Sequence, residues 1–78
     1  MAANAKQPAR LGGNGWKAMQ ALEDSLLRLA VVERLTQRLD VANEHGNYRL
    51  VTALNAEIRG EVATVKQTLG DAARGVYQ

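Results

Sequence analysis

The residues able to take part in chemistry are few in this 78-residue chain, and their spacing gives no catalytic arrangement. His45 could act as a base beside Glu44, but a histidine in a short turn is most often a solvated surface residue. Ser25 is the single serine, and no base lies next to it in the sequence. We therefore expect that the protein is not an enzyme and that it uses no small-molecule substrate or cofactor.

Metal and phosphate sites have no better support in the sequence. The chain has no cysteine and one histidine, which excludes the usual structural zinc sites. Glu57 and Glu61 lie one helical turn apart, and we expect both on solvated helix surface. The glycine-rich stretch 11–15 follows no strand and lacks the lysine and hydroxyl pair of a phosphate loop.

Basic residues gather near the N-terminus of a chain whose net charge is only +2. Lys6, Arg10 and Lys17 all precede the first acid, Glu23. These three are candidate phosphate contacts, and such binding would depend strongly on salt. No zinc finger, recognition helix or aromatic platform accompanies them, so nucleic-acid binding is kept as an alternative function.

Arg34 and Arg38 form a second basic pair, one helical turn apart. They either add to a phosphate-binding surface or form ion pairs with Glu33, Asp40 or the acids of a neighbouring subunit.

The elements that position these residues are predicted to be helices. Helix-favouring residues are abundant, proline occurs once, and apolar and polar residues do not alternate as in strands. The sequence predicts an all-α fold, an antiparallel two-helix hairpin with an extended N-terminal arm. The predicted segments are an arm over 1–15, helices over about 16–43 and 48–70, a loop over 44–47 and a short C-terminal tail.

The residues flanking the predicted helices support these boundaries. Asn14 is a candidate N-cap for the first helix, and its start is open between Asn14 and Met19. Gly46 suits the left-handed position after a helix, and Asn47 suits the following N-cap. A loop this short makes the two helices antiparallel neighbours.

The apolar residues of the first helix form two sets that are out of phase. The early set is Met19, Leu22, Leu26 and Leu29, and the later set is Val32, Leu35, Leu39 and Ala42. Because the apolar stripe turns around the helix, much of the run 26–32 would face water in a lone hairpin. Leu26, Leu27 and Val31 are therefore candidate partner contacts.

The second helix has large apolar residues on one side and small residues nearly opposite. The large stripe is Val51, Leu54, Ile58, Val62, Val65 and Leu69, and its eleven-residue spacing favours a straight or slightly right-handed seam. The small stripe is Ala53, Ala56, Gly60, Ala63, Gln67 and Gly70. Small residues allow close approach of another helix, so Ala53, Ala56, Gly60 and Ala63 are candidate contacts. A tolerated surface glycine is the alternative for Gly60.

Trp16 is the single tryptophan and lies at the junction of the arm and the first helix. It either closes the open end of the hairpin or anchors in a partner pocket. We expect it level with residues 69–76 of the second helix, with Tyr77 as a neighbour.

The order of residues 22–65 resembles helical hairpins of small tailed-bacteriophage proteins. The segments compared are ALEDSLLRLA, ERLTQRLD and YRLVTALNAEIRGEV, joined by a short loop with glycine. The likeness includes parts of DNA-packaging terminase small subunits and small virion components. It implies a subunit of a particle or ring, because 78 residues leave no room for a separate DNA-binding domain.

A short chain without a disulfide commonly gains stability by association. We therefore expect a non-enzymatic assembly subunit that packs into a homo-oligomer or larger complex through the second helix and the arm. It contains no apolar run that would span a membrane, and we expect it in the cytoplasm, or in a virion if it is phage-encoded. The alternatives are a nucleic-acid-binding accessory protein and a small inhibitor of one protein partner.

Overall fold

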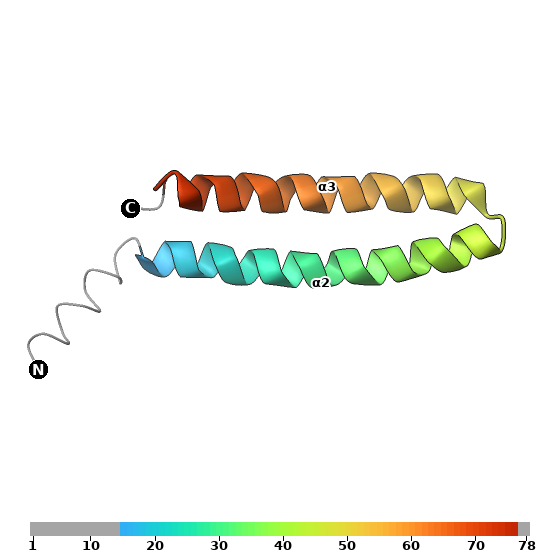
Figure 1. Cartoon of the computed structure of the whole chain (residues 1–78), viewed down its shortest axis with the longest axis horizontal. Helices are drawn as coiled ribbons and strands as arrows, with labels where there is room; N and C mark the ends of the chain where they lie inside the picture. Colours follow the sequence, from blue (N-terminus) through green and yellow to red (C-terminus); the bar gives the residue numbers. More distant parts are fainter. Residues whose placement is uncertain (1–14, 77–78) are drawn as a thin grey trace, which may run out of the picture.

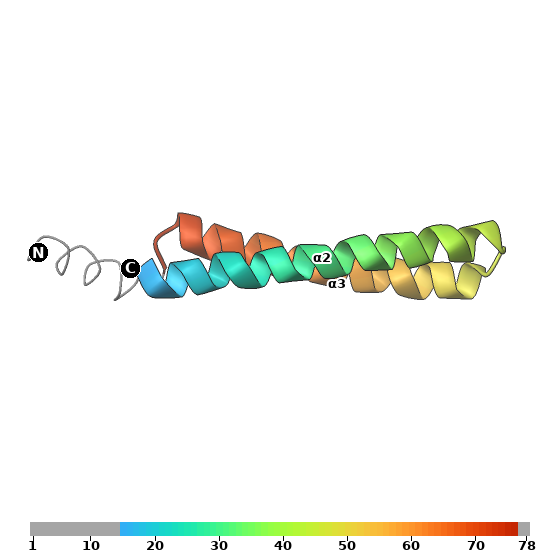
Figure 2. The same ribbon diagram turned by 90° about the horizontal axis from the view of Figure 1, so that it is seen from below.

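The computed structural model describes residues 15–76 and consists of two long helices joined by a tight turn (Figure 1). Helix α2 spans Trp16–Glu44 and helix α3 spans Tyr48–Ala73. The helices lie antiparallel along their whole length and wind slowly about each other (Figure 2). With no strand among these residues, the predicted all-α hairpin is confirmed. Residues 1–14 of the predicted arm, including Lys6, Arg10 and Asn14, lie outside the described residues, as does Tyr77.

The turn between the helices is closed by the residues predicted for it. Gly46 has a φ of 70°, and its amide donates to the carbonyl of Asn43. The amide of Asn47 donates to the carbonyl of Ala42, which completes the hydrogen-bond pattern of a Schellman turn. The side chain of Asn47 then accepts from the amide of Leu50 as the N-cap of α3.

Helix α3 ends at Ala73. The sequence predicts a helix over about 48–70 that either frays or resumes after Gly70 through residues 71–74, and in the structure the helix continues. The left-handed glycine is Gly75, with a φ of 77°. Its amide donates to Ala72, and the amide of Val76 donates to Asp71, so this end is a second Schellman turn. Gly70 stays helical, because a glycine stops a helix only where the backbone turns left-handed.

Burial along both helices recurs at alternating steps of three and four residues. In α2 these buried and half-buried positions, hereafter the seam, are Ala18, Ala21, Ser25, Arg28, Val32, Leu35, Leu39 and Ala42. In α3 the seam is Val51, Leu54, Ile58, Glu61, Val65, Thr68 and Ala72. This is the seven-residue pattern of a coiled coil, so the predicted eleven-residue seam was wrong.

The two halves of the seam differ in what they bury. Next to the turn, Leu35, Ala42 and Leu54 form an apolar cluster, and Leu54 is only 1% exposed. Toward the open end, α2 contributes small residues instead, among them Ala21 and Ser25. The open half therefore buries much less apolar area, and apolar burial is the main source of stability.

An ion pair crosses the seam where the two halves meet. Arg28 Nη1 lies 3.0 Å from Glu61 Oε1, and Arg28 Nε lies 2.9 Å from Asp24 Oδ2. The hydrogen bond to Asp24 and then the one to Glu61 raise the pKa of the Arg28 guanidinium above its usual value. Glu61 is half-buried, so its predicted place on solvated surface was wrong.

Candidate protein-interaction surface

In the open half of α2, the large apolar side chains point away from α3. The residue that follows each seam position in the open half of α2 is large and apolar, and it is exposed. These residues are Met19, Leu22, Leu26 and Leu29, with exposed fractions of 60%, 48%, 68% and 41%. The two predicted apolar sets thus lie on different sides of α2, and only the later set is in the seam.

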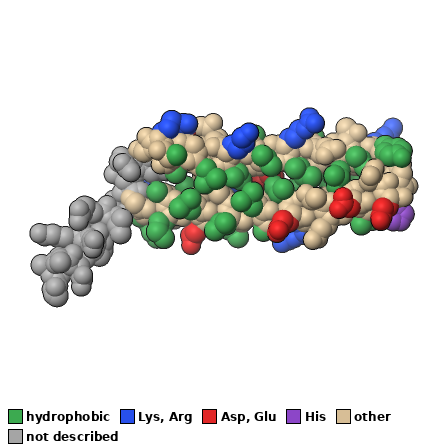
Figure 3. Space-filling model, viewed as in Figure 1, with side chains coloured by type: hydrophobic (Ala, Val, Ile, Leu, Met, Phe, Trp, Pro, Cys, Tyr) green, Lys and Arg blue, Asp and Glu red, His purple; other side chains and the backbone are tan. Residues whose placement is uncertain are grey.

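The row that follows the seam faces the same side of the hairpin in both helices, because the helices are antiparallel. In α3 this row contains Val62, which is half-buried, and Leu69, which is 38% exposed. Figure 3 shows apolar side chains gathered over both helices in the open half of this side. We call this surface the apolar face and define it by Met19, Leu22, Leu26, Leu29, Val62 and Leu69.

The charged residues in the same two rows differ in sign between the helices. In α2 the row continues with Glu33 and Asp40, whereas in α3 it contains Arg59 and Lys66. Figure 3 shows the same division, with basic side chains along α3 and acidic side chains on α2. None of these four residues forms an ion pair within the described part of the chain.

The opposite side of the hairpin carries the row that precedes the seam in α2. Leu27 and Val31 lie there and are exposed, so the structure separates them from Leu26. The three remain predicted contacts, on two different sides of α2.

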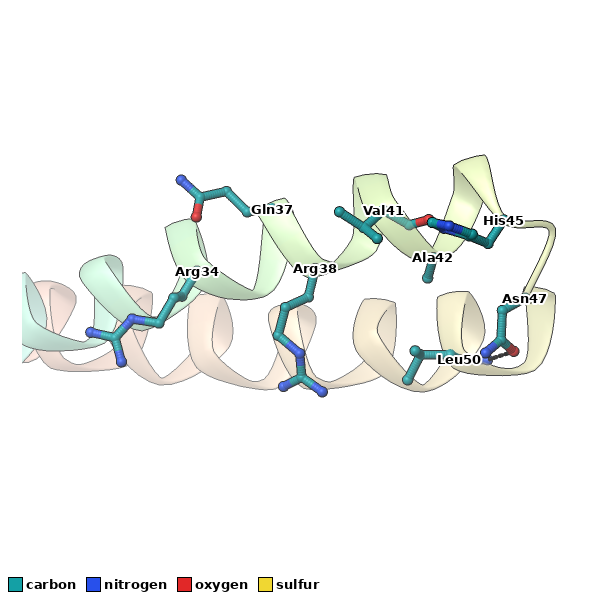
Figure 4. A pocket seen from close by; sticks show the side chains of 8 residues that line it. All are labelled: Arg34, Gln37, Arg38, Val41, Ala42, His45, Asn47 and Leu50. Carbon is teal, nitrogen blue, oxygen red and sulfur yellow. Dashed lines mark hydrogen bonds between the residues drawn. The ribbon is translucent and has the colours of Figure 1, made fainter.

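A groove of about 450 Å³ lies beside the turn on this second side (Figure 4). Its lining residues, hereafter the loop groove, are Arg34, Gln37, Arg38, Val41, Ala42, His45, Asn47 and Leu50. Within residues 15–76, neither Arg34 nor Arg38 forms an ion pair, so their predicted pairing with Glu33 or Asp40 is absent. The guanidinium groups of Arg34 and Arg38 give this groove the positive charge that an anionic ligand requires.

His45 belongs to the end of α2 rather than to a reactive cluster. Its Nδ1 lies 2.8 Å from the carbonyl oxygen of Val41. Because a carbonyl only accepts, Nδ1 carries the proton and donates it to this helix-terminal carbonyl.

The small residues of α3 point away from α2. Ala53, Ala56, Gly60 and Ala63, hereafter the small face, are all exposed. A Cβ added to Gly60 would have no heavy atom within 4 Å, so no part of this chain needs a glycine there. Gly70 is different, because a Cβ there would lie 3.1 Å from Nη1 of Arg74. The small face remains a predicted contact.

Trp16 and Lys17 are exposed at the first turn of α2. The start of α2 and the end of α3 lie at the same end of the hairpin, as expected for Trp16 (Figure 1). Trp16 is 57% exposed, so it does not fill a closed pocket between the helices.

Sequence reasoning missed the seam residues of the open half. Ser25 and Arg28 are polar and Ala21 is small, so none was chosen as a packing residue. The signal was present, because steps of four and three counted back from Ala42 reach all three positions.

The described residues include neither a cluster of metal ligands nor a membrane-spanning helix. No group of three or more potential metal ligands occurs in the described segment. Neither α2 nor α3 contains a stretch long and apolar enough to cross a bilayer. Comparisons with protein-family models, with curated proteins and with solved structures found no match to this chain.

Proposed function

We propose that this protein is a non-enzymatic assembly subunit, which works by packing its apolar face against another protein chain. The supporting observation is that, in the open half of α2, the large apolar side chains lie outside the seam while small side chains lie inside it. Burying one such side chain completely is worth about 1.5–3 kcal/mol, so covering this row would add much to a small hairpin. A particle or ring, as in the resemblance to phage proteins, is one setting for such a subunit.

The experiment compares the wild type with Leu26→Gln, which changes the centre of the exposed apolar row. We expect the purified wild type to sediment as an oligomer, or to sediment with other proteins in an extract of its source. The variant should associate at least about tenfold more weakly. Far-UV circular dichroism should be unchanged, because Leu26 is 68% exposed.

Leu27→Gln is the matched control, since Leu27 is 69% exposed on the opposite side of the hairpin. Equal effects of the two substitutions would contradict the assignment to the apolar face. Association that survives Leu26→Gln unchanged would overturn the proposed function.

Binding of nucleic-acid phosphates is the second candidate. It is favoured by the guanidinium groups of Arg34 and Arg38 in the loop groove, which form no ion pair within residues 15–76. These groups lie on the side opposite the apolar face, so phosphate binding there would not explain why the apolar side chains of that face are exposed. Association with another protein does explain these exposed apolar side chains, and we therefore prefer it to phosphate binding.

A further inference from the structure

The positions of α2 and α3 that lie level with each other follow a simple rule. Arg28 forms an ion pair with Glu61, and the carbonyl of Ala42 accepts a hydrogen bond from the amide of Asn47. In both pairs the residue numbers add up to 89, so a residue of α2 lies level with the residue of α3 that completes this sum. If two copies pair without a shift along the hairpin, this rule also tells which residues of the two copies face each other.

Two acids of α2 and two bases of α3 match by this rule. Glu23 is level with Lys66, and Glu33 is within three residues of the level of Arg59, or about 4.5 Å along the axis. Glu33, Arg59 and Lys66 lie in the rows of the apolar face, and Glu23 lies one position further out on α2. Within one hairpin the two rows border opposite edges of this side, and neither acid forms an ion pair within residues 15–76. Both acids are therefore free to pair with bases of another chain.

We propose that the apolar face is covered by a second copy of this chain, related by a two-fold axis parallel to the length of the hairpin. Helix α2 of each copy then packs against α3 of the other, and the two hairpins form a four-helix bundle. This inference rests on the proposed function and names the partner within it.

Charge selects this arrangement over the other face-to-face dimer. The axis along the hairpin keeps every residue at its level, so Glu23 meets Lys66 and Glu33 meets Arg59 of the second copy, each twice by symmetry. An axis across the hairpin would instead place α2 on α2, and the acidic row would meet no basic row. Charges that flank an apolar seam decide partner and orientation in this way in coiled coils.

The apolar contacts agree with this pairing. Leu26 is nearly level with Val62 of the second copy, and Met19 is nearly level with its Leu69, since each pair adds up to 88. Lys66 lies among these residues, and its long apolar stem packs against them while its ammonium group reaches the edge.

The test uses two charge-reversed full chains, Arg59→Glu with Lys66→Glu and Glu23→Lys with Glu33→Lys. Sedimentation equilibrium of the purified wild type should show a dimer. Each reversed chain alone should associate at least about tenfold more weakly, because like charges then face each other. An equimolar mixture of the two reversed chains should restore a dimer, within about threefold of the wild type in affinity.

Arg34→Glu with Arg38→Glu is the control, since it makes the same charge change on the loop-groove side and should leave the dimer intact. A mixture that stays monomeric overturns the pairing of α2 with α3. A wild type that stays monomeric up to about millimolar concentration overturns the second copy as partner. In that case the effect of Leu26→Gln on complexes with other proteins still decides the proposed function.

Discussion

Ser25 is a buried polar residue in the open half of the seam. It is 2% exposed, and Oγ forms no hydrogen bond within the described residues. A buried hydroxyl without a partner costs about 1–3 kcal/mol. The site is therefore a local defect in a seam of small residues.

Ser25→Ala should raise the free energy of unfolding by about 1 kcal/mol, because it removes the unpaired hydroxyl and keeps a small side chain in the seam. Urea unfolding followed by circular dichroism measures the change. Ser25→Val is the comparison, since its extra volume should strain the same site and lower stability. A destabilised Ser25→Ala would show that the hydroxyl has a partner in solution.

At the scale of the element, α3 contains a glycine that its own fold does not require. Gly60 is exposed in mid-helix, and an added Cβ meets open space. Gly60→Ala should therefore raise the free energy of unfolding by about 0.5–1 kcal/mol through helix propensity. Thermal and urea unfolding of the two chains provide the measurement.

Gly60→Leu separates the stability of α3 from contacts of the small face. Leucine favours helix nearly as well as alanine, but its bulk would block close approach of another helix. Normal helix content with loss of assemblies larger than a dimer is expected if the small face is a contact. Unchanged assembly would leave Ala53, Ala56, Gly60 and Ala63 as plain solvent-exposed surface.

The elements themselves were readable from the sequence to within a few residues. Gly46 and Asn47 gave the turn, because left-handed backbone and a side-chain cap require particular residue types. The sequence leaves the end of α3 open, because two glycines, Gly70 and Gly75, compete for the same role. The choice depends on which carbonyls the following amides reach, and a list of residues does not show this.

The candidate surface was harder to predict than the helices. The change of phase between Leu29 and Val32 shows that α2 has two apolar sides, but not which of them meets α3. In the structure, the side of α2 that meets α3 contains Arg28, which pairs with Glu61, and follows a seven-residue pattern that includes small and polar residues. In the open half, size and polarity alone favoured Leu22, Leu26 and Leu29 as packing residues, and the structure places these three outside the seam.

The whole molecule is a long, thin pair of helices with little interior. A chain of this size is marginally stable by itself, and binding of a second copy adds stability that depends on concentration. The midpoint of thermal unfolding should rise as the wild-type concentration is raised from about 1 to 100 μM. Differential scanning calorimetry would measure the shift.

The same scan of Leu26→Gln should show a lower midpoint that does not move with concentration. Added salt should lower the wild-type midpoint at fixed concentration, since the pairs at the edge of the dimer are screened. A midpoint independent of concentration in the wild type would indicate a self-sufficient monomer.

The apolar cluster beside the turn also sets the order in which the hairpin forms. Leu35, Ala42 and Leu54 are close in sequence, so the contacts that stabilise most also close the shortest loops. We therefore expect folding to begin at the turn and to proceed toward the termini, and opening to run in the reverse direction. Amide hydrogens near Trp16 and Ala73 then exchange first, and a bound neighbour slows exchange most at that end.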